Sequence, residues 1–147
     1  MKLKIAWIGK TKDPAIQTLT SEYLKRISRY TEVEHLVLSD ESALLKLRAQ
    51  TGNRPVHTIV LLDSRGKQLS SEDFARFLQS HQDRAPLPLV LAIGPADGFT
   101  DQARQSASVI LSLGKMTLPH ELARVVLLEQ VYRAFTILKG HPYHTGH

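Results

Sequence analysis

Apolar and polar positions follow two patterns along the chain, one typical of strands and one typical of helices. Residues 2–9 alternate Leu3, Ile5 and Trp7 with smaller or charged side chains and end at a glycine, which predicts a strand. The Asp13–Pro14 pair is a typical helix start, and apolar residues spaced three or four apart then predict a helix to about residue 30. The same patterns predict four more strands over residues 33–39, 57–63, 87–93 and 109–113, and four more helices over residues 40–50, from Ser70, from Thr100 and from Pro119 to about residue 139.

Five predicted strands therefore alternate with five predicted helices. This alternation indicates an α/β fold, a mostly parallel sheet flanked by helices on both faces. No internal repeat, low-complexity tract or linker interrupts it, so we expect a single domain over residues 1–147. Ligands of such sheets bind outside the carboxyl ends of the strands. Three strand ends are thus candidate sites, at residues 62–63, 93–95 and 113–118.

Composition narrows the class of protein. The net charge is +5 and the isoelectric point about 9.6, which favours a polyanionic partner, nucleic acid first, although a basic surface also serves solubility. The chain has no cysteine, which excludes disulfides, thiolate metal sites and a cysteine nucleophile and agrees with a reducing cytoplasm. Its apolar runs are too short for a signal peptide or a membrane span. We expect a cytoplasmic protein without a membrane partner.

Two loops at strand ends carry glycine. The segment IGPADGF places Gly94 at the end of a strand and Gly98 just before a helix cap, where the backbone can turn sharply and approach a ligand. Neither the dinucleotide fingerprint GxGxxG nor the phosphate loop GxxxxGK[ST] occurs in the chain. The segment LGKMTLPHE exposes backbone N–H and C=O groups that could form hydrogen bonds with a planar base. Ordinary connections between elements are the alternative for both loops.

The last predicted helix is apolar around most of its circumference, and only Glu129, Arg133 and Thr136 form a narrow polar strip. Since one core supplies one side, we expect the other side to face a second copy of the chain. Glu129 and Arg133 are four residues apart and form an ordinary helix-surface ion pair. Arg124 falls on the apolar arc, where it could cross a dimer interface, bind an anion or extend to the helix edge.

The chain ends in GHPYHTGH, with three histidines around one tyrosine. This tail, with the preceding helix, carries a resemblance: LSLGKMTL and PHELARVVLLEQVYRAFTILKGHPYH (residues 119–144) resemble the carboxyl-terminal half of the RlmH (YbeA) family of SPOUT-class methyltransferases. The similarity extends through YLKR (residues 23–26), LD (62–63), GK (66–67) and SSE (70–72), and so covers essentially the whole chain.

The resemblance implies an activity and a fold. Members of the family methylate N3 of a pseudouridine in 23S ribosomal RNA with S-adenosyl-L-methionine as donor. It also implies a trefoil knot near the carboxyl end, a homodimer, and RNA of the ribosome, not DNA, as partner. The cofactor residues implied by the family match are Leu62, Gly94, Leu113, Gly114, Lys115, Met116, Thr117 and Leu118. One subunit's tail is expected to meet the cofactor held by the other.

The tail supplies the candidate catalytic groups. The N3–H of pseudouridine must lose its proton, and histidine titrates in the useful range. We expect His144 to act as base or orienter, Tyr143 to position the uracil ring, and His141 or Arg133 to contact RNA phosphate. Alternatively, His141, His144 and His147 bind a metal ion, or the tail is disordered. We expect no metal, since no carboxylate partner is evident in the sequence.

Two positions depart from the family pattern. Pro95 stands where a second glycine is usual and removes one N–H donor. Thr145 stands where a basic residue is common. These departures keep open a non-catalytic ribosome-binding protein as an alternative. A generic nucleotide-binding enzyme is the third possibility, which the missing phosphate motifs disfavour.

Overall fold

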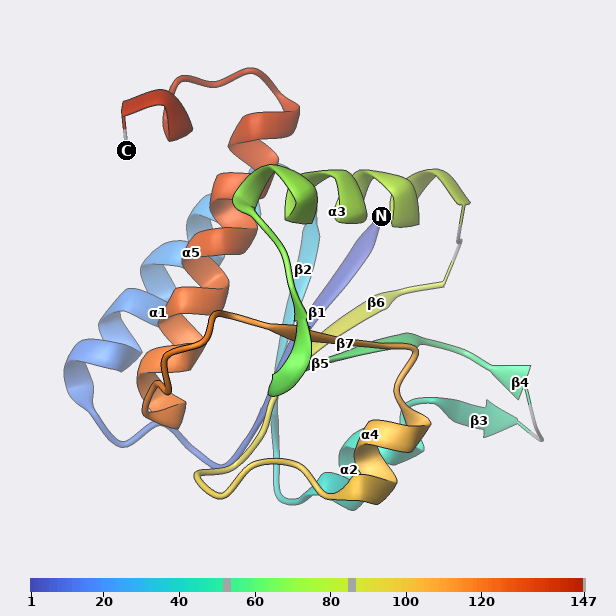
Figure 1. The fold of residues 1–147 in the computed structure, drawn as a ribbon. Coiled ribbons are helices and arrows are strands. Elements are labelled where there is room, and N and C mark those ends of the chain that lie inside the picture. Colours follow the sequence, from blue (N-terminus) through green and yellow to red (C-terminus); the bar gives the residue numbers. More distant parts are fainter. Residues whose placement is uncertain (52–53, 85–86, 147) are drawn as a thin grey trace.

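The computed structural model describes residues 1–51, 54–84 and 87–146 and confirms the predicted α/β class (Figure 1). Five parallel strands form one sheet in the order β2-β1-β6-β5-β7. The strands are β1 (Lys2–Ile8), β2 (Glu32–Leu38), β5 (Thr58–Gln68), β6 (Leu89–Ile93) and β7 (Val109–Ser112).

The predicted helix starts at Asp13 and Thr100 are confirmed by their caps. The Asp13 carboxylate accepts the N–H of Ala15 at 2.8 Å, and the Thr100 hydroxyl accepts the N–H of Ala103 at 3.3 Å. Side-chain acceptors of this kind satisfy N–H groups that a helix start leaves without a partner. The helices are α1 (Pro14–Ile27), α2 (Glu41–Lys46), α3 (Ser71–Arg84), α4 (Asp101–Ser106) and α5 (His120–Leu138), followed by a 3-10 turn over His144–Gly146.

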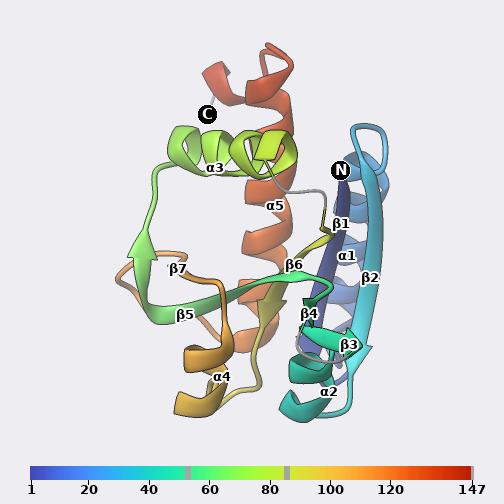
Figure 2. The same cartoon turned by 90° about the vertical axis from the view of Figure 1, so that its right-hand side faces the viewer.

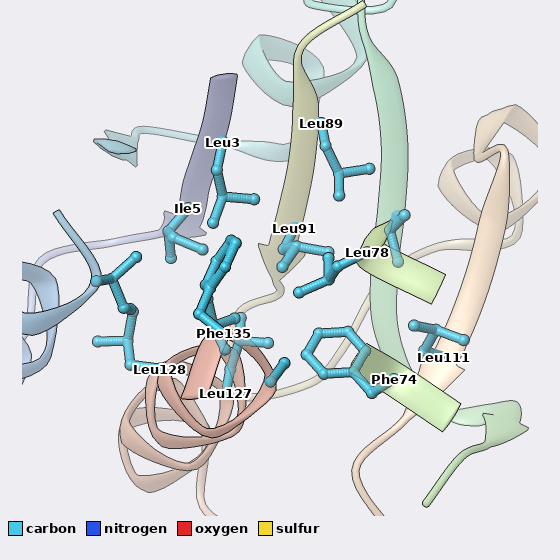
Figure 3. Close-up of a cluster of buried hydrophobic side chains, with 14 of the residues drawn as sticks. Leu3, Ile5, Phe74, Leu78, Leu89, Leu91, Leu111, Leu127, Leu128 and Phe135 are labelled. Carbon is cyan, nitrogen blue, oxygen red and sulfur yellow. The ribbon is translucent and has the colours of Figure 1, made fainter. Parts of the chain in front are cut away.

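The sheet is covered on both faces. Helices α1, α3 and α5 pack on one face, and the smaller α2 and α4 pack on the other (Figures 1 and 2). The larger core lies under α5, where Leu127, Leu128 and Phe135 meet the strand residues Leu3 and Leu91 (Figure 3). The larger core therefore fixes α5 on the sheet.

The predicted second helix is too long. It ends at Lys46, and the chain then forms a small antiparallel pair, β3 (Ala49–Thr51) with β4 (Arg54–Pro55). The carbonyl groups at the helix end find partners further along the chain: the Arg48 carbonyl accepts the N–H of Val56 at 2.8 Å, and a His57 ring nitrogen bonds the Leu47 carbonyl at 2.7 Å. These long-range bonds override the local helix preference.

Strand β5 runs five residues beyond its predicted end. Both Leu62 and Lys67 pair with Leu111 of β7, so residues 63–66 make an excursion between two pairings. Gly66 lies so close to β7 that an added Cβ would stand 2.6 Å from the carbonyl carbon of Leu111. The polar sequence DSRGKQ gave no sign of a strand. The trefoil knot implied by the family stays a prediction.

Arg124 follows none of the alternatives predicted for it. It is 0 % exposed, and its guanidinium donates to the Ile8 carbonyl and to the Thr11 hydroxyl, each at 2.9 Å. The guanidinium carbon also lies 5.0 Å from the centre of the Trp7 ring. Burial lowers the pKa of Arg124. The side chain thus ties the start of α5 to the end of β1.

The apolar circumference of α5 is accounted for within the same chain. Helices α1 and α3 flank it, and Val131, Ala134 and Phe135 are buried in their shared core. Among the large apolar residues of α5, Leu122 is the exposed one, at 42 %. The apolar pattern of α5 is therefore no evidence for a dimer, and the homodimer stays a prediction. Among the described residues no helix is long and apolar enough to cross a membrane.

Candidate active site

The three predicted strand ends meet around one cavity of about 190 Å³. Because β6, β5 and β7 are neighbours in the parallel sheet, their carboxyl ends lie at the same edge. Seven of the eight predicted cofactor residues line the cavity; the exception is Lys115, which is exposed. The seven are Leu62, Gly94, Leu113, Gly114, Met116, Thr117 and Leu118.

Backbone conformation shapes the cavity wall. Gly98 and Gly114 have φ of +82° and +146°, which side-chain-bearing residues rarely adopt. The carbonyl of Pro95 accepts the N–H of Gly98 at 2.9 Å and closes the turn after β6. Within the described part of the chain, no acceptor bonds the backbone N–H groups of residues 115–118. The loop before α5 thus carries backbone donors beside an apolar wall.

Sequence reasoning missed several cavity residues. Asp63 was noted as a strand end only, yet its carboxylate lines the cavity and is held there by the N–H of Arg65 at 2.9 Å and by the Arg104 guanidinium at 3.3 Å. Phe99 presents its ring to Gly94, where an added Cβ would approach the ring atoms to 3.3 Å. His120 reaches the cavity from the first turn of α5. The position of His120 just after the LGKMTLP loop was the available signal.

A second cavity of about 290 Å³ adjoins the first. Leu62, Ser112 and Leu113 line both cavities. The second one continues beneath α3 and α5, where Ser71 donates to the side-chain oxygen of Gln130 at 2.7 Å. Leu62 therefore lies between two adjoining cavities at the edge of the sheet formed by β5 and β7.

The tail packs on α5 and α3 of its own chain. The Tyr143 hydroxyl donates to Glu129 at 2.7 Å, and its ring lies edge-on to Tyr132 at 4.8 Å. Arg133 bonds Glu129 through two nitrogens, at 2.8 and 3.2 Å, and its guanidinium carbon lies 5.1 Å from the centre of the Tyr143 ring. His144 bonds both Arg133, at 2.9 Å, and Glu72, at 2.7 Å. The predicted residues Arg133, Tyr143 and His144 thus form one network.

Charge and burial shift the pKa values within this network. Burial and the hydrogen bond to Glu129 raise the pKa of Tyr143, which keeps the phenol protonated. The Glu129 carboxylate raises the pKa of Arg133. The hydrogen bond from His144 lowers the pKa of Glu72 below its usual value, so this carboxyl group is ionised at neutral pH.

The other predicted tail groups lie apart from this network. The His141 side chain is exposed, and its ring nitrogen accepts the N–H of Tyr143 at 3.3 Å. Thr145 donates to the Pro142 carbonyl at 2.7 Å. His147 lies outside the described residues, and within them no three histidine, aspartate or glutamate side chains gather as metal ligands.

The cavity and the tail lie at opposite ends of α5. His120 and Ala123 of the first turns border the cavity, whereas the tail follows Leu138 at the far end (Figure 1). A helix of 19 residues is about 28 Å long. The tail therefore does not lie over the cavity of its own chain.

Comparison with known proteins identifies the family of the chain. A family model described as "Predicted SPOUT methyltransferase" matches residues 1–144. The chain belongs to the SPOUT methyltransferase family. It is 59 % identical to a ribosomal RNA large subunit methyltransferase H from Koribacter versatilis, over 100 % of both chains. It is 44 % identical to the protein of that name from Trichlorobacter lovleyi, over 98 % of this chain and 99 % of that one.

Solved structures share the SPOUT fold at low identity. A probable methyltransferase from Bordetella pertussis matches with a TM-score of 0.60 and 10 % identity, over 90 % of this chain and 93 % of that one. A probable rRNA-methyltransferase from Porphyromonas gingivalis matches with a TM-score of 0.55 and 19 % identity, over 93 % and 69 %. These structures support the α/β architecture, whereas the family model and the two relatives establish the methyltransferase family.

Proposed function

We propose that this enzyme transfers a methyl group from S-adenosyl-L-methionine to N3 of a pseudouridine in 23S ribosomal RNA, in the cytoplasm and as a homodimer. The observation that carries the proposal is the full-length similarity to proteins named ribosomal RNA large subunit methyltransferase H. The net charge of +5 supports an RNA partner.

The cavity at the strand ends fits the donor. Its apolar walls, Leu62, Leu113 and Leu118 among them, suit a flat adenine ring. The backbone N–H groups of residues 115–118 are available to bond the polar edge of such a ring. S-adenosyl-L-methionine supplies a methyl group on a sulfonium, a leaving group that needs no acid. The chain's own task is then to orient the acceptor base and remove its N3 proton.

The separation of cavity and tail supports a homodimer with shared sites. Tyr143 and His144 contact Glu129 and Arg133, which lie about 14 and 20 Å along α5 from His120 at the cavity, so we infer that the tail serves the cavity of the second protomer. His144 acts there on the N3 proton, Tyr143 orients the uracil ring, and Arg133 or His141 contacts RNA phosphate. Each active site then contains the cavity of one protomer and the tail of the other.

Methyl transfer to ribosomal RNA from cells lacking the activity tests the reaction, with nucleoside mass spectrometry to locate the methyl group. We expect a methyl group on N3 of pseudouridine. Saturable binding of S-adenosyl-L-methionine in calorimetry separates the enzyme from a non-catalytic ribosome-binding protein, which predicts no such binding. Gly114→Val forces a branched side chain into φ of +146° and should weaken donor binding about tenfold. Gln102→Ala, on exposed α4, is the matched control.

Mixing two defective variants tests the shared site. At donor concentrations well below the dissociation constant, Gly114→Val keeps only about a tenth of the activity of an intact cavity, and His144→Ala lacks a working tail. In randomly mixed homodimers, half of the pairs are mixed and each mixed pair has one intact site, so about a quarter of the wild-type activity should return. A site built within one chain predicts no recovery. A protein that sediments as a monomer at assay concentration would also refute the shared site.

A further inference from the structure

The hydrogen bonds of His144 define where its proton lies. The Arg133 guanidinium can only donate, so the Nδ1 atom of His144, 2.9 Å from Arg133 Nη1, is the acceptor. In the neutral ring the proton is therefore on Nε2, which lies 2.7 Å from the Oε1 atom of Glu72 and donates to it. Glu72 and Arg133 together fix the tautomer and the plane of the imidazole.

Glu72 comes from a different part of the chain than the tail. It lies in the first turn of α3, 72 residues from His144 in sequence. The Ser70 hydroxyl caps this turn by accepting the N–H of Asp73 at 3.0 Å. The positive end of the α3 dipole also favours an ionised carboxylate at this position. Glu72 is thus a fixed negative acceptor on a rigid element of the fold.

Arg133 is anchored independently of His144. Its Nε and Nη2 atoms bond the two carboxylate oxygens of Glu129, at 3.2 and 2.8 Å, and only Nη1 bonds the imidazole. The Nη1 contact can therefore pass from Nδ1 of His144 to an oxygen of bound RNA while the bonds to Glu129 persist. That exchange leaves the Nδ1 lone pair available.

We propose that Glu72 is a positioning residue for methyl transfer: its carboxylate holds His144 with the proton on Nε2, so that Nδ1 is the atom that accepts the N3 proton of the substrate. This inference rests on the proposed function. As the N3–H bond breaks, its proton bonds Nδ1, and N3 forms its bond to the methyl carbon. The carbon–sulfur bond breaks and sulfur keeps the electron pair as a neutral thioether. Glu72 stabilises the resulting imidazolium, which later loses its proton to water.

The groups that face His144 favour this assignment. Glu72 lies on the α3 side, Glu129 and Arg133 on the α5 side, and Tyr143 and His141 precede it in the tail. Glu129 is already neutralised by its two bonds from Arg133. Glu72 is the carboxylate that contacts the imidazole directly and accepts the hydrogen bond from its Nε2 atom.

Nitrogen NMR of histidine-labelled full-length protein tests the tautomer without any reaction. His144→Asn assigns the signals, because it removes one imidazole. We expect His144 in the Nε2–H form in the wild type and a mixture of tautomers in Glu72→Gln and Glu72→Ala. Asp73→Asn is the matched control, since it removes a neighbouring charge in the same turn. The Asp73 carboxylate pairs with Arg76 and not with the tail. An Nδ1–H form in the wild type overturns the proposal.

Steady-state kinetics test the role. We expect Glu72→Gln to lower kcat about 10- to 100-fold with KM for both substrates unchanged. Asp73→Asn should match the wild type in kcat and in both KM values. Equal kcat in Glu72→Gln and Asp73→Asn refutes the positioning role. A wild type that shows the Nε2–H form but transfers no methyl group instead refutes the proposed function.

Discussion

Gly66 is the position where one small substitution should have the largest effect on the fold. Its backbone crosses β7 so closely that a Cβ would lie 2.6 Å from the Leu111 carbonyl carbon and 2.7 Å from the Ile110 carbonyl carbon. Its φ lies outside the left-handed region, so an alanine backbone is allowed there and only the neighbouring strand forbids the methyl group. Both obstructing atoms are backbone, and neither can turn away as a side chain would.

Gly66→Ala must therefore separate β5 from β7 locally. Overpacking of a tight contact costs 1–3 kcal/mol, and a contact with backbone on the far side belongs at the upper end, about 3 kcal/mol. For a chain of this size we expect the melting temperature to fall by about 10 °C. The assay is thermal and urea unfolding at one fixed protein concentration, because a dimer melts in a concentration-dependent way.

Ser64→Ala is the matched control for Gly66→Ala. Ser64 is exposed in the same excursion of β5, and its substitution should change the free energy of unfolding by less than about 0.5 kcal/mol. A Gly66→Ala protein as stable as the Ser64→Ala protein would refute the close crossing of the two strands.

Three further predictions concern buried and titratable groups. Arg124→Ala leaves a cavity and removes both charged donors at the end of β1, so urea unfolding should show a loss of about 3 kcal/mol; a loss below 1 kcal/mol would contradict its tying role. Burial, and then the charge of Arg124, lower the pKa of His35 below that of the unfolded chain, so stability is lost as pH falls below about 6.5. His35→Phe keeps a ring against Trp7 and should flatten this pH dependence, measured by urea unfolding between neutral and mildly acidic pH; an unchanged slope would show that His35 is not the cause. Because the pKa of Tyr143 is raised, its phenol should stay protonated over the usual range of tyrosine ionisation. The wild type and Tyr143→Phe should then gain the same phenolate absorbance over that range. A smaller gain in Tyr143→Phe would show that the Tyr143 phenol ionises like one in water.

The features that sequence predicted correctly are those encoded by neighbouring residues. The caps at Asp13 and Thr100 form within three residues of their partners, and the buried strands are continuous apolar runs. Their carboxyl ends then located the cavity, since parallel strands bring such ends together. The candidate cofactor residues therefore followed from topology as well as from family resemblance.

The features that sequence missed depend on contacts between distant segments. The second half of β5 is polar and becomes a strand because β7, more than 40 residues later, pairs with it. Glu72 looked like part of a helix cap, and nothing near it in sequence indicates a bond to His144. Arg124 was expected at an edge or an interface, but its partners Ile8 and Thr11 come from the opposite end of the chain. The spacing of apolar residues predicts one helix or strand at a time and does not predict contacts between segments far apart in sequence.

The double pairing of β5 with β7 has a consequence for synthesis on the ribosome. Until residues 109–112 have emerged, both halves of β5 present an unpaired edge to solvent, and the loop that completes the cavity does not yet exist. The amino-terminal two thirds of the chain can assemble β2, β1, β6 and the first half of β5 earlier, since these strands precede β7. The cavity is thus completed late in translation, and a nascent chain stalled before Val109 carries an aggregation-prone edge in place of a binding site.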